Sequence, residues 1–386
     1  MKRVEWANAL RGAAALIVIV AHFGVVFWMN QDAGAGLARR SPLYSGDAAA
    51  PGFARLLAAA PLEFGALGVA LFFLLSGYVI AISLDRYSRR GFIIGRAMRV
   101  LPTYAAGYLV TCAVVWAMSD PGGELVPSHV LAGMIPGLPI VLGIPAPADG
   151  IVWTLIVELV FYGVCLVAYR SLTRSPWVIL AASVTCAAAQ LVIPVPLASG
   201  TLLGGILYIL LLACPFIPVM LVGATLSAAR RGQVSRQATA LLVPVLVVTH
   251  VVLLSTSAVL PVAVEYRATF VVAIALFCVF ASMGRPRSPH RLSSFFADIS
   301  YPLYVVHPVL GYAFLSVLAG RGVPAIVAVL AATIVAIAAA WLLHVAVERP
   351  SHRWGRRWAG RFADAPRADE AARGRQSEEP VVRVAT

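Results

Sequence analysis

A series of apolar segments, each about 20 residues long, is the feature that most constrains how this chain can fold. A helix of about 20 apolar residues crosses the hydrocarbon core of a bilayer. Hydrophobic residues make up 60% of the chain and its mean hydropathy is +0.87, which is typical of a protein solvated mostly by lipid. We therefore expect an all-α, polytopic membrane helical bundle of about ten transmembrane helices. The expected spans are residues 7–29, 66–84, 98–119, 151–169, 176–195, 203–227, 239–257, 266–283, 298–319 and 323–347.

Proline and glycine interrupt this pattern at two places. Pro215 and Pro218 predict a kink inside the sixth span, because proline removes a backbone donor and clashes with the preceding turn. Residues 126–148 are apolar but rich in proline and glycine, which is typical of a re-entrant loop. The first apolar run is too long for a secretory signal and contains His22, so we interpret it as a retained helix.

The basic residues indicate how the bundle is oriented. Arginines such as Arg86, Arg170 and Arg230 fall in alternate loops, on one side of a ten-helix arrangement. The positive-inside rule makes that side cytoplasmic, so both termini are expected there. Most of the net charge of +13 then reflects topology and attraction to lipid surfaces, and we expect no nucleic-acid partner because no soluble basic fold presents these charges.

The domain organisation follows from the same composition. Residues 1–350 are interpreted as one transmembrane domain. Residues 351–386 are interpreted as a basic, disordered cytoplasmic tail, because this segment has few large apolar residues to bury. The five cysteines lie within expected helices and show neither paired nor metal-like spacing, so we expect no metal site.

Ionisable residues at membrane depth are costly and mark functional sites by default. Arg11 and His22 lie on one face of the first span, because 11 residues make about three helical turns. His22 and Glu158 are each expected roughly 10 Å below the outer surface, given a rise of about 1.5 Å per residue. We expect Glu158 to orient His22 for chemistry. The alternative is an interhelical hydrogen bond that only holds the bundle together.

A second polar layer is expected near the cytoplasmic side. Arg11, Arg96 and Arg99 lie in it, and three guanidinium groups suit a polyanion. Arg11 lies inside a helix and needs a partner, either a carboxylate such as Glu348 or the phosphates of a ligand. The same layer includes Tyr104, Ser300, Tyr301 and Tyr304.

Two further positions have open interpretations. Ser76, beside Gly77 in the second span, either hydrogen-bonds a ligand or permits close helix packing. Tyr304 and His307 share a helix face in the ninth span, where chemistry and core packing are both consistent with their position.

Six motifs follow one another along the chain: LRGAAAL through His22, then GVALFFLLSGY, RAMRVLP, WTLIVELVFY, ISYPLYVVH and ERP. Taken together, they resemble the motifs of the acyltransferase family 3 membrane proteins. Thr154 stands where serine is frequent in that family, and Gly95 stands where a second arginine often precedes Arg96.

The resemblance implies a multi-pass O-acyltransferase of the bacterial cytoplasmic (inner) membrane. Such an enzyme moves an acyl group, often acetyl, from cytoplasmic acyl-CoA to a hydroxyl of an extracytoplasmic or membrane-linked acceptor, commonly a saccharide. His22 would act as general base or acyl-accepting nucleophile, with Glu158 orienting it. Acyl-CoA would be the donor substrate, and membrane lipid is a further expected partner. The residues that would bind acyl-CoA are Arg11, Arg96, Arg99, Ser76, Tyr301 and Tyr304.

A transporter is the alternative from another functional class. Arg11, His22 and Glu158 could form the polar relay of a polytopic exporter of a lipid-linked saccharide. A transporter built from repeats should show matching halves with broken helices at corresponding positions. The sequence shows no such symmetry.

Overall fold

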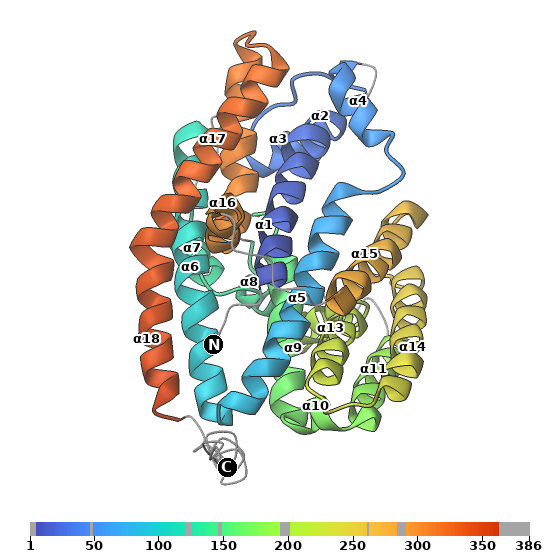
Figure 1. Cartoon of the computed structure of the whole chain (residues 1–386). Helices are drawn as coiled ribbons and strands as arrows, with labels where there is room; N and C mark the ends of the chain where they lie inside the picture. The colour runs from blue at the N-terminus through green and yellow to red at the C-terminus, as the bar shows by residue number, and fades with distance from the viewer. Residues whose placement is uncertain are drawn as a thin grey trace, which may run out of the picture.

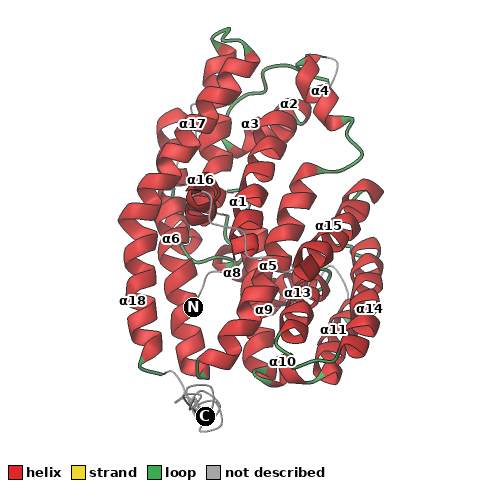
Figure 2. Cartoon of the chain, in the orientation of Figure 1, coloured by secondary structure: helices red, strands yellow, loops and turns green. Residues whose placement is uncertain are grey.

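The computed structural model describes residues 5–46, 49–120, 125–145, 149–193, 201–260, 262–283 and 291–362. Within these ranges every regular element is a helix (Figures 1 and 2), which confirms the all-α prediction. Seven helical spans are long and apolar enough to cross a membrane, and the protein is therefore a multi-pass membrane protein. The first long span is α1 (Glu5–Ile19), which continues through the π-helix η1 (Val20–Val26) into α2 (Phe27–Met29). The last is α17 (Ala325–Leu343), which continues through the π-helix η3 (His344–Glu348) into α18 (Arg349–Gly360). The long helices between them are α5 (Phe64–Arg86), α6 (Arg89–Met118), α14 (Arg236–Ser255), α15 (Val264–Met283) and α16 (Arg291–Gly320).

Three of the ten expected spans are shorter or broken helices. α9 (Val152–Ala168) and α11 (Pro176–Val192) are apolar but have 17 residues each. α12 (Leu202–Ala213) and α13 (Ile217–Arg230) form a pair bent by 52°, and this pair raises the number of spans to eight if it counts as one. The number of ten transmembrane spans and the cytoplasmic location of both termini remain predictions. The remaining short helices are α3 (Gln31–Leu37), α4 (Gly52–Ala58), α7 (Pro127–Gly133), α8 (Leu138–Leu142) and α10 (Ser171–Arg174).

The bend between α12 and α13 confirms the kink predicted at Pro215 and Pro218. A helix that breaks in an apolar environment leaves carbonyl groups without backbone donors, and another group must satisfy them. His250 of α14 does this, because its Nδ1–H donates to the Pro215 carbonyl at 2.6 Å. The break is thus held by a side chain from a neighbouring helix.

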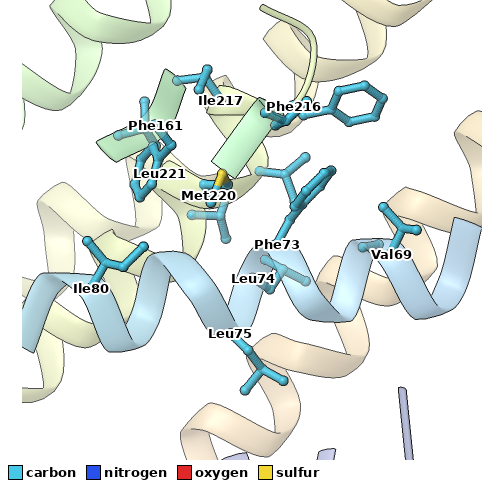
Figure 3. Packing of buried hydrophobic residues seen from close by; sticks show 14 of the residues in the cluster. Val69, Phe73, Leu74, Leu75, Ile80, Phe161, Phe216, Ile217, Met220 and Leu221 are labelled. Atoms are coloured by element: carbon cyan, nitrogen blue, oxygen red, sulfur yellow. The ribbon is translucent and has the colours of Figure 1, made fainter. Parts of the chain in front are cut away.

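The largest core cluster surrounds α5, which crosses α13 at very short range. A Cβ atom at Gly77 would overlap the Met220 carbonyl, and a Cβ at Gly223 would overlap the Leu74 carbonyl. In Figure 3, Phe73 points from α5 toward Phe216, and their ring centroids are 5.3 Å apart. Glycine on both helices therefore lets the two backbones meet, while large side chains fill the space beside the crossing.

α16 packs between α1 and α17, and it also contacts η1, where His22 meets Tyr312. The ring of Phe23 lies where a Cβ at Gly311 would be, and Gly12 lies against the α16 backbone at Ala297. Alanines at intervals of four form the buried face of α17: Ala328, Ala332, Ala336 and Ala340. Small residues thus bring α1, α16 and α17 close together.

Two other sequence expectations concern the stretch 126–148 and the C-terminal tail. The stretch expected as a re-entrant loop contains α7 and α8, with residues 146–148 outside the described residues. α18 runs beside α6 (Figure 1) and extends helical structure to Gly360, ten residues beyond the boundary expected at residue 350. Gly355 lies against Met98 of α6, which explains why this polar sequence has a packed face. Residues 363–386 of the expected tail lie outside the described residues.

Candidate active site

A cavity of about 610 Å³ lies where α1, α16 and the α17–α18 junction meet. Five arginines line it, from α1, α6 and α18: Arg11, Arg99, Arg349, Arg353 and Arg356. A smaller cavity of about 70 Å³ shares Arg11, Arg99, Ser300 and Tyr301 with it, so the two adjoin. The sequence prediction of a cationic layer around Arg11 and Arg99 is therefore matched by a cavity that those side chains line.

Arg11 lines both cavities, and in the described part of the chain no hydrogen bond or ion pair joins its guanidinium to another residue. Glu158 and Glu348 lie near enough to attract its charge without direct contact. Glu348, one of the two partners considered from the sequence, is bound instead by His344, whose Nδ1 lies 2.5 Å from Oε2 of Glu348. An unpaired cation inside a helical bundle is costly, so the arrangement favours an anionic ligand at Arg11.

Arg96 is held differently from Arg99. Its guanidinium donates to Ser83 Oγ at 2.5 Å and lies over the rings of Phe92 and Tyr162, at 5.5 and 5.6 Å from their centroids. It lines a third cavity of about 200 Å³ between α5, α6 and α18, whereas Arg99 lines all three cavities. Arg96 and Arg99 belong to the same RAMRVLP motif, but only Arg99 lines the two cavities that Arg11 lines.

Glu158 of α9 lines the small cavity together with Arg11 and Ser76. Its Oε1 accepts hydrogen bonds from Ser76 Oγ–H at 2.9 Å and from the Tyr162 hydroxyl at 2.6 Å. Ser76 therefore faces the cavity, while its neighbour Gly77 makes the close helix contact. Close packing is thus confirmed at Gly77, and a hydrogen bond from Ser76 to a ligand stays a prediction.

The hydrogen bond expected between Glu158 and His22 is not formed. His22 Nδ1 lies 2.6 Å from the hydroxyl of Tyr312, and its ring meets the ring of His307 edge to face at 4.7 Å between centroids. Depth along each helix placed Glu158 and His22 in one layer, but the rotation of α9 about its axis turns Glu158 toward α5. Tyr312, and not Glu158, is the residue that orients His22.

His22 lies within η1, where the helix widens by one residue per turn. Such widened turns are often found at functional sites. Tyr304 connects this region to the small cavity, because it lines the cavity and its ring centroid is 5.8 Å from that of His307. The Tyr304 hydroxyl shares a hydrogen bond of 2.8 Å with Thr154 Oγ1, and Tyr301 donates to the Val100 carbonyl at 3.0 Å.

Sequence reasoning missed Tyr312 and left His307 open. Tyr312 is fully buried and meets His22 across 290 positions of sequence, so no local pattern could pair them. The one available signal was that Tyr312 lies within the same α16 segment as Tyr304 and His307. Among the described residues, no group of three or more His, Cys, Asp or Glu side chains could hold a metal ion.

These features define a polytopic helical membrane protein with a cationic cavity and, beyond Tyr304 of the adjoining small cavity, a pair of imidazoles. The chain belongs to acyltransferase family 3, because the family model described as "Acyltransferase domain" matches residues 4–345, nearly its whole length. It is a membrane acyltransferase. No curated protein and no solved structure matches the chain.

Proposed function

We propose that this protein moves an acyl group, of which acetyl is the best candidate, from cytoplasmic acyl-CoA to a hydroxyl of an extracytoplasmic or membrane-linked saccharide. The observation that carries the proposal is the unpaired Arg11 in a cavity lined by five arginines. The phosphates of coenzyme A carry about four negative charges, and charge-assisted hydrogen bonds from guanidinium groups are strong. Membership of the family supports acyl transfer, and the cationic cavity supports a polyanionic donor such as acyl-CoA.

The shape of the two adjoining cavities supports a direction for the donor. The larger cavity has room for the nucleotide and its phosphates beside Arg349 and Arg353. The small cavity, lined by Ser76, Glu158 and Tyr304, is narrow and suits the pantetheine arm. In this pose the thioester points past Tyr304 toward His22, which acts as base on the acceptor hydroxyl or as the acyl-accepting nucleophile.

The transporter alternative needs Arg11, His22 and Glu158 in one relay. Glu158 is bound to Ser76 and Tyr162, and His22 is bound to Tyr312. Glu158 and His22 therefore belong to two separate hydrogen-bonded sets, and Arg11 is hydrogen-bonded to neither, which favours the enzyme over the transporter.

Donor binding and turnover test the proposal with one set of variants. Arg11→Ala should weaken acetyl-CoA binding about 10- to 150-fold, because a hydrogen bond to a charged group contributes about 1.5–3 kcal/mol. Arg11→Lys should restore little of the affinity if the guanidinium binds two phosphate oxygens at once. His22→Ala should abolish transfer from radiolabelled acetyl-CoA to membrane saccharide.

The matched control is Arg90→Ala, because Arg90 is exposed on α6 and does not line the three cavities. Binding is measured by titration calorimetry, and transfer is normalised to folded protein by size-exclusion chromatography. Undiminished acetyl-CoA binding by Arg11→Ala would contradict the donor site. Normal turnover per folded molecule of His22→Ala would contradict the chemistry.

A further inference from the structure

His307 has its protonated nitrogen fixed by the backbone of its own helix. Pro308 has no N–H, so the carbonyl of Tyr304 lacks the donor that an unbroken helix would supply. His307 Nδ1 replaces that donor, at 2.9 Å from the Tyr304 carbonyl and 3.1 Å from the Leu303 carbonyl. A carbonyl oxygen only accepts hydrogen bonds, so Nδ1 carries the proton and Nε2 of the neutral ring presents a lone pair.

That lone pair is buried and has no partner. The His307 side chain is fully buried, and Nε2 forms no hydrogen bond. Leaving a buried acceptor unsatisfied costs about 1–3 kcal/mol, so such a group calls for an explanation. The His307 ring stands perpendicular to that of His22, 4.7 Å away between centroids. Two imidazoles thus lie next to each other, and the ring of His307 is also 5.8 Å from that of Tyr304, which lines the small cavity.

His250 shows which part of this arrangement is specific. Its Nδ1–H also donates to a carbonyl at a proline break, its side chain is also fully buried, and its Nε2 also lacks a partner. However, the rings nearest to His250 belong to Phe216 and Phe270, at 6.1 and 4.9 Å. Of these two histidines, only His307 combines the unpartnered nitrogen with a neighbouring imidazole and with Tyr304, which lines the cavity.

We propose that His307 is the general base for the acceptor hydroxyl, and that His22 carries the acyl group between donor and acceptor. This inference rests on the proposed function and divides its chemistry between the two histidines. His22 Nδ1–H donates to the Tyr312 hydroxyl in this scheme, which leaves Nε2 of His22 free to attack. The two rings therefore each present an Nε2 lone pair and perform different steps.

The transfer takes place in two balanced steps. First, Nε2 of His22 attacks the thioester carbon, the carbon–sulfur bond breaks, and coenzyme A leaves as its thiolate. Second, the acceptor hydroxyl donates to Nε2 of His307, and its oxygen attacks the acyl carbon. The proton passes to His307, the carbon–nitrogen bond breaks, and the electron pair returns to His22. His307 then releases its proton to water, and the cycle can start again.

Two variants separate base chemistry from a structural role. His307→Asn keeps a side-chain N–H where Nδ1 stands, so it can still donate to the Tyr304 carbonyl, but it has no basic nitrogen. His307→Gln places its amide near the position of Nε2, where it can hydrogen-bond a hydroxyl without accepting its proton. If one variant fails to fold, the other still tests the base. His250→Asn is the matched control, because it makes the same change at the break between α12 and α13.

Each half of the reaction has its own measurement. Without an acceptor, exchange of labelled coenzyme A into acetyl-CoA reports acyl transfer to and from His22. With membranes of the source cells, incorporation of labelled acetyl into saccharide reports the complete reaction. We expect both His307 variants to retain exchange and to lose incorporation by about 100-fold or more, the range of general acid–base catalysis. His250→Asn should retain both activities.

The possible failures are distinguishable from one another. Incorporation at the unaltered rate in His307→Asn would overturn the role of His307 and leave the proposed function intact. Loss of exchange in both folded His307 variants, or absence of exchange in the unaltered protein, would overturn the division into two steps. Normal incorporation by His22→Ala would overturn the role of His22 as acyl carrier, whereas absence of incorporation by the unaltered protein would contradict the proposed function itself.

Discussion

At the scale of single residues, the site depends on which partner each buried polar group finds. Glu158 and His22 were expected to bind each other, and instead each has its own hydroxyl partners: Ser76 and Tyr162 for Glu158, and Tyr312 for His22. A hydrogen bond at Nδ1 sets which nitrogen of an imidazole is available for chemistry. The residue that controls His22 is therefore Tyr312 on α16.

Removal of the Tyr312 hydroxyl should slow the chemistry of His22 without affecting the donor. We expect Tyr312→Phe to lower kcat about two- to tenfold, because a neutral hydrogen bond contributes about 0.5–1.5 kcal/mol. The KM for acetyl-CoA should stay unchanged, because Tyr312 does not line the arginine cavity. Steady-state kinetics of the purified protein give both constants, with Tyr208→Phe on the exposed side of α12 as the control. An unchanged kcat would show that Tyr312 does not orient His22.

At the scale of elements, close helix crossings position the site. α5 supplies Ser76 to the cavity and meets α13 through Gly77 and Gly223. Because α13 begins after the break at Pro215, its direction is set by the 52° bend and by the bond from His250. The two helices can then approach closely enough to hold the cavity wall in place.

A methyl group at this crossing should destabilise the whole bundle. Gly77→Ala puts Cβ into the Met220 carbonyl, and overpacking of this kind costs about 1–3 kcal/mol. We expect a lower thermal unfolding midpoint in detergent, measured by the loss of the monodisperse peak after heating.

Gly163→Ala on α9 is the matched control for this change. A Cβ there meets no atom within 4 Å, and alanine favours a helix over glycine by about 1 kcal/mol. This variant should unfold at the same temperature or higher. Equal midpoints for the two variants would contradict the account of the α5–α13 crossing.

At the scale of the whole molecule, charged groups gather at two ends, and most of the arginines lie at one of them. Figure 1 shows α10 and α18 at one end and α3 and α4 at the other. The first end carries the arginines of α10 and α18, along with the ion pair of Arg231 with Asp85 at 3.2 Å. At the other end, Asp120 accepts hydrogen bonds from the Ser41 hydroxyl and backbone N–H, which keep the pKa of its carboxyl below its ordinary value.

Reporter fusions test the orientation that follows from this asymmetry. Alkaline phosphatase fused after Asp120 should be active, because the enzyme folds only outside the cytoplasm. The same reporter fused after Arg231 should be inactive. A cytoplasmic reporter such as green fluorescent protein at both positions should give the opposite pattern and controls for expression. The reversed result for both reporters would place the arginine cavity on the outer side and exclude a cytoplasmic donor.

The sequence alone determined the features that depend on local composition. Apolar runs predicted the helices, because an apolar segment in lipid must satisfy its own backbone hydrogen bonds, as a helix does. Pro215 and Pro218 predicted the break, because proline acts on its own turn. The cationic layer around Arg11 and Arg99 was also visible, since depth along a helix follows from counting residues.

Only the tertiary structure decided which of these residues meet. The partners Tyr312 for His22 and Ser76 for Glu158 depend on how each helix is rotated and tilted against its neighbours. Rotation and tilt are set by contacts such as Gly77 against Met220, from segments more than 100 positions apart. Counting residues gives the depth of a side chain in the membrane but not the direction in which it points. The division between an arginine cavity and a histidine pair could therefore emerge only from the packed bundle.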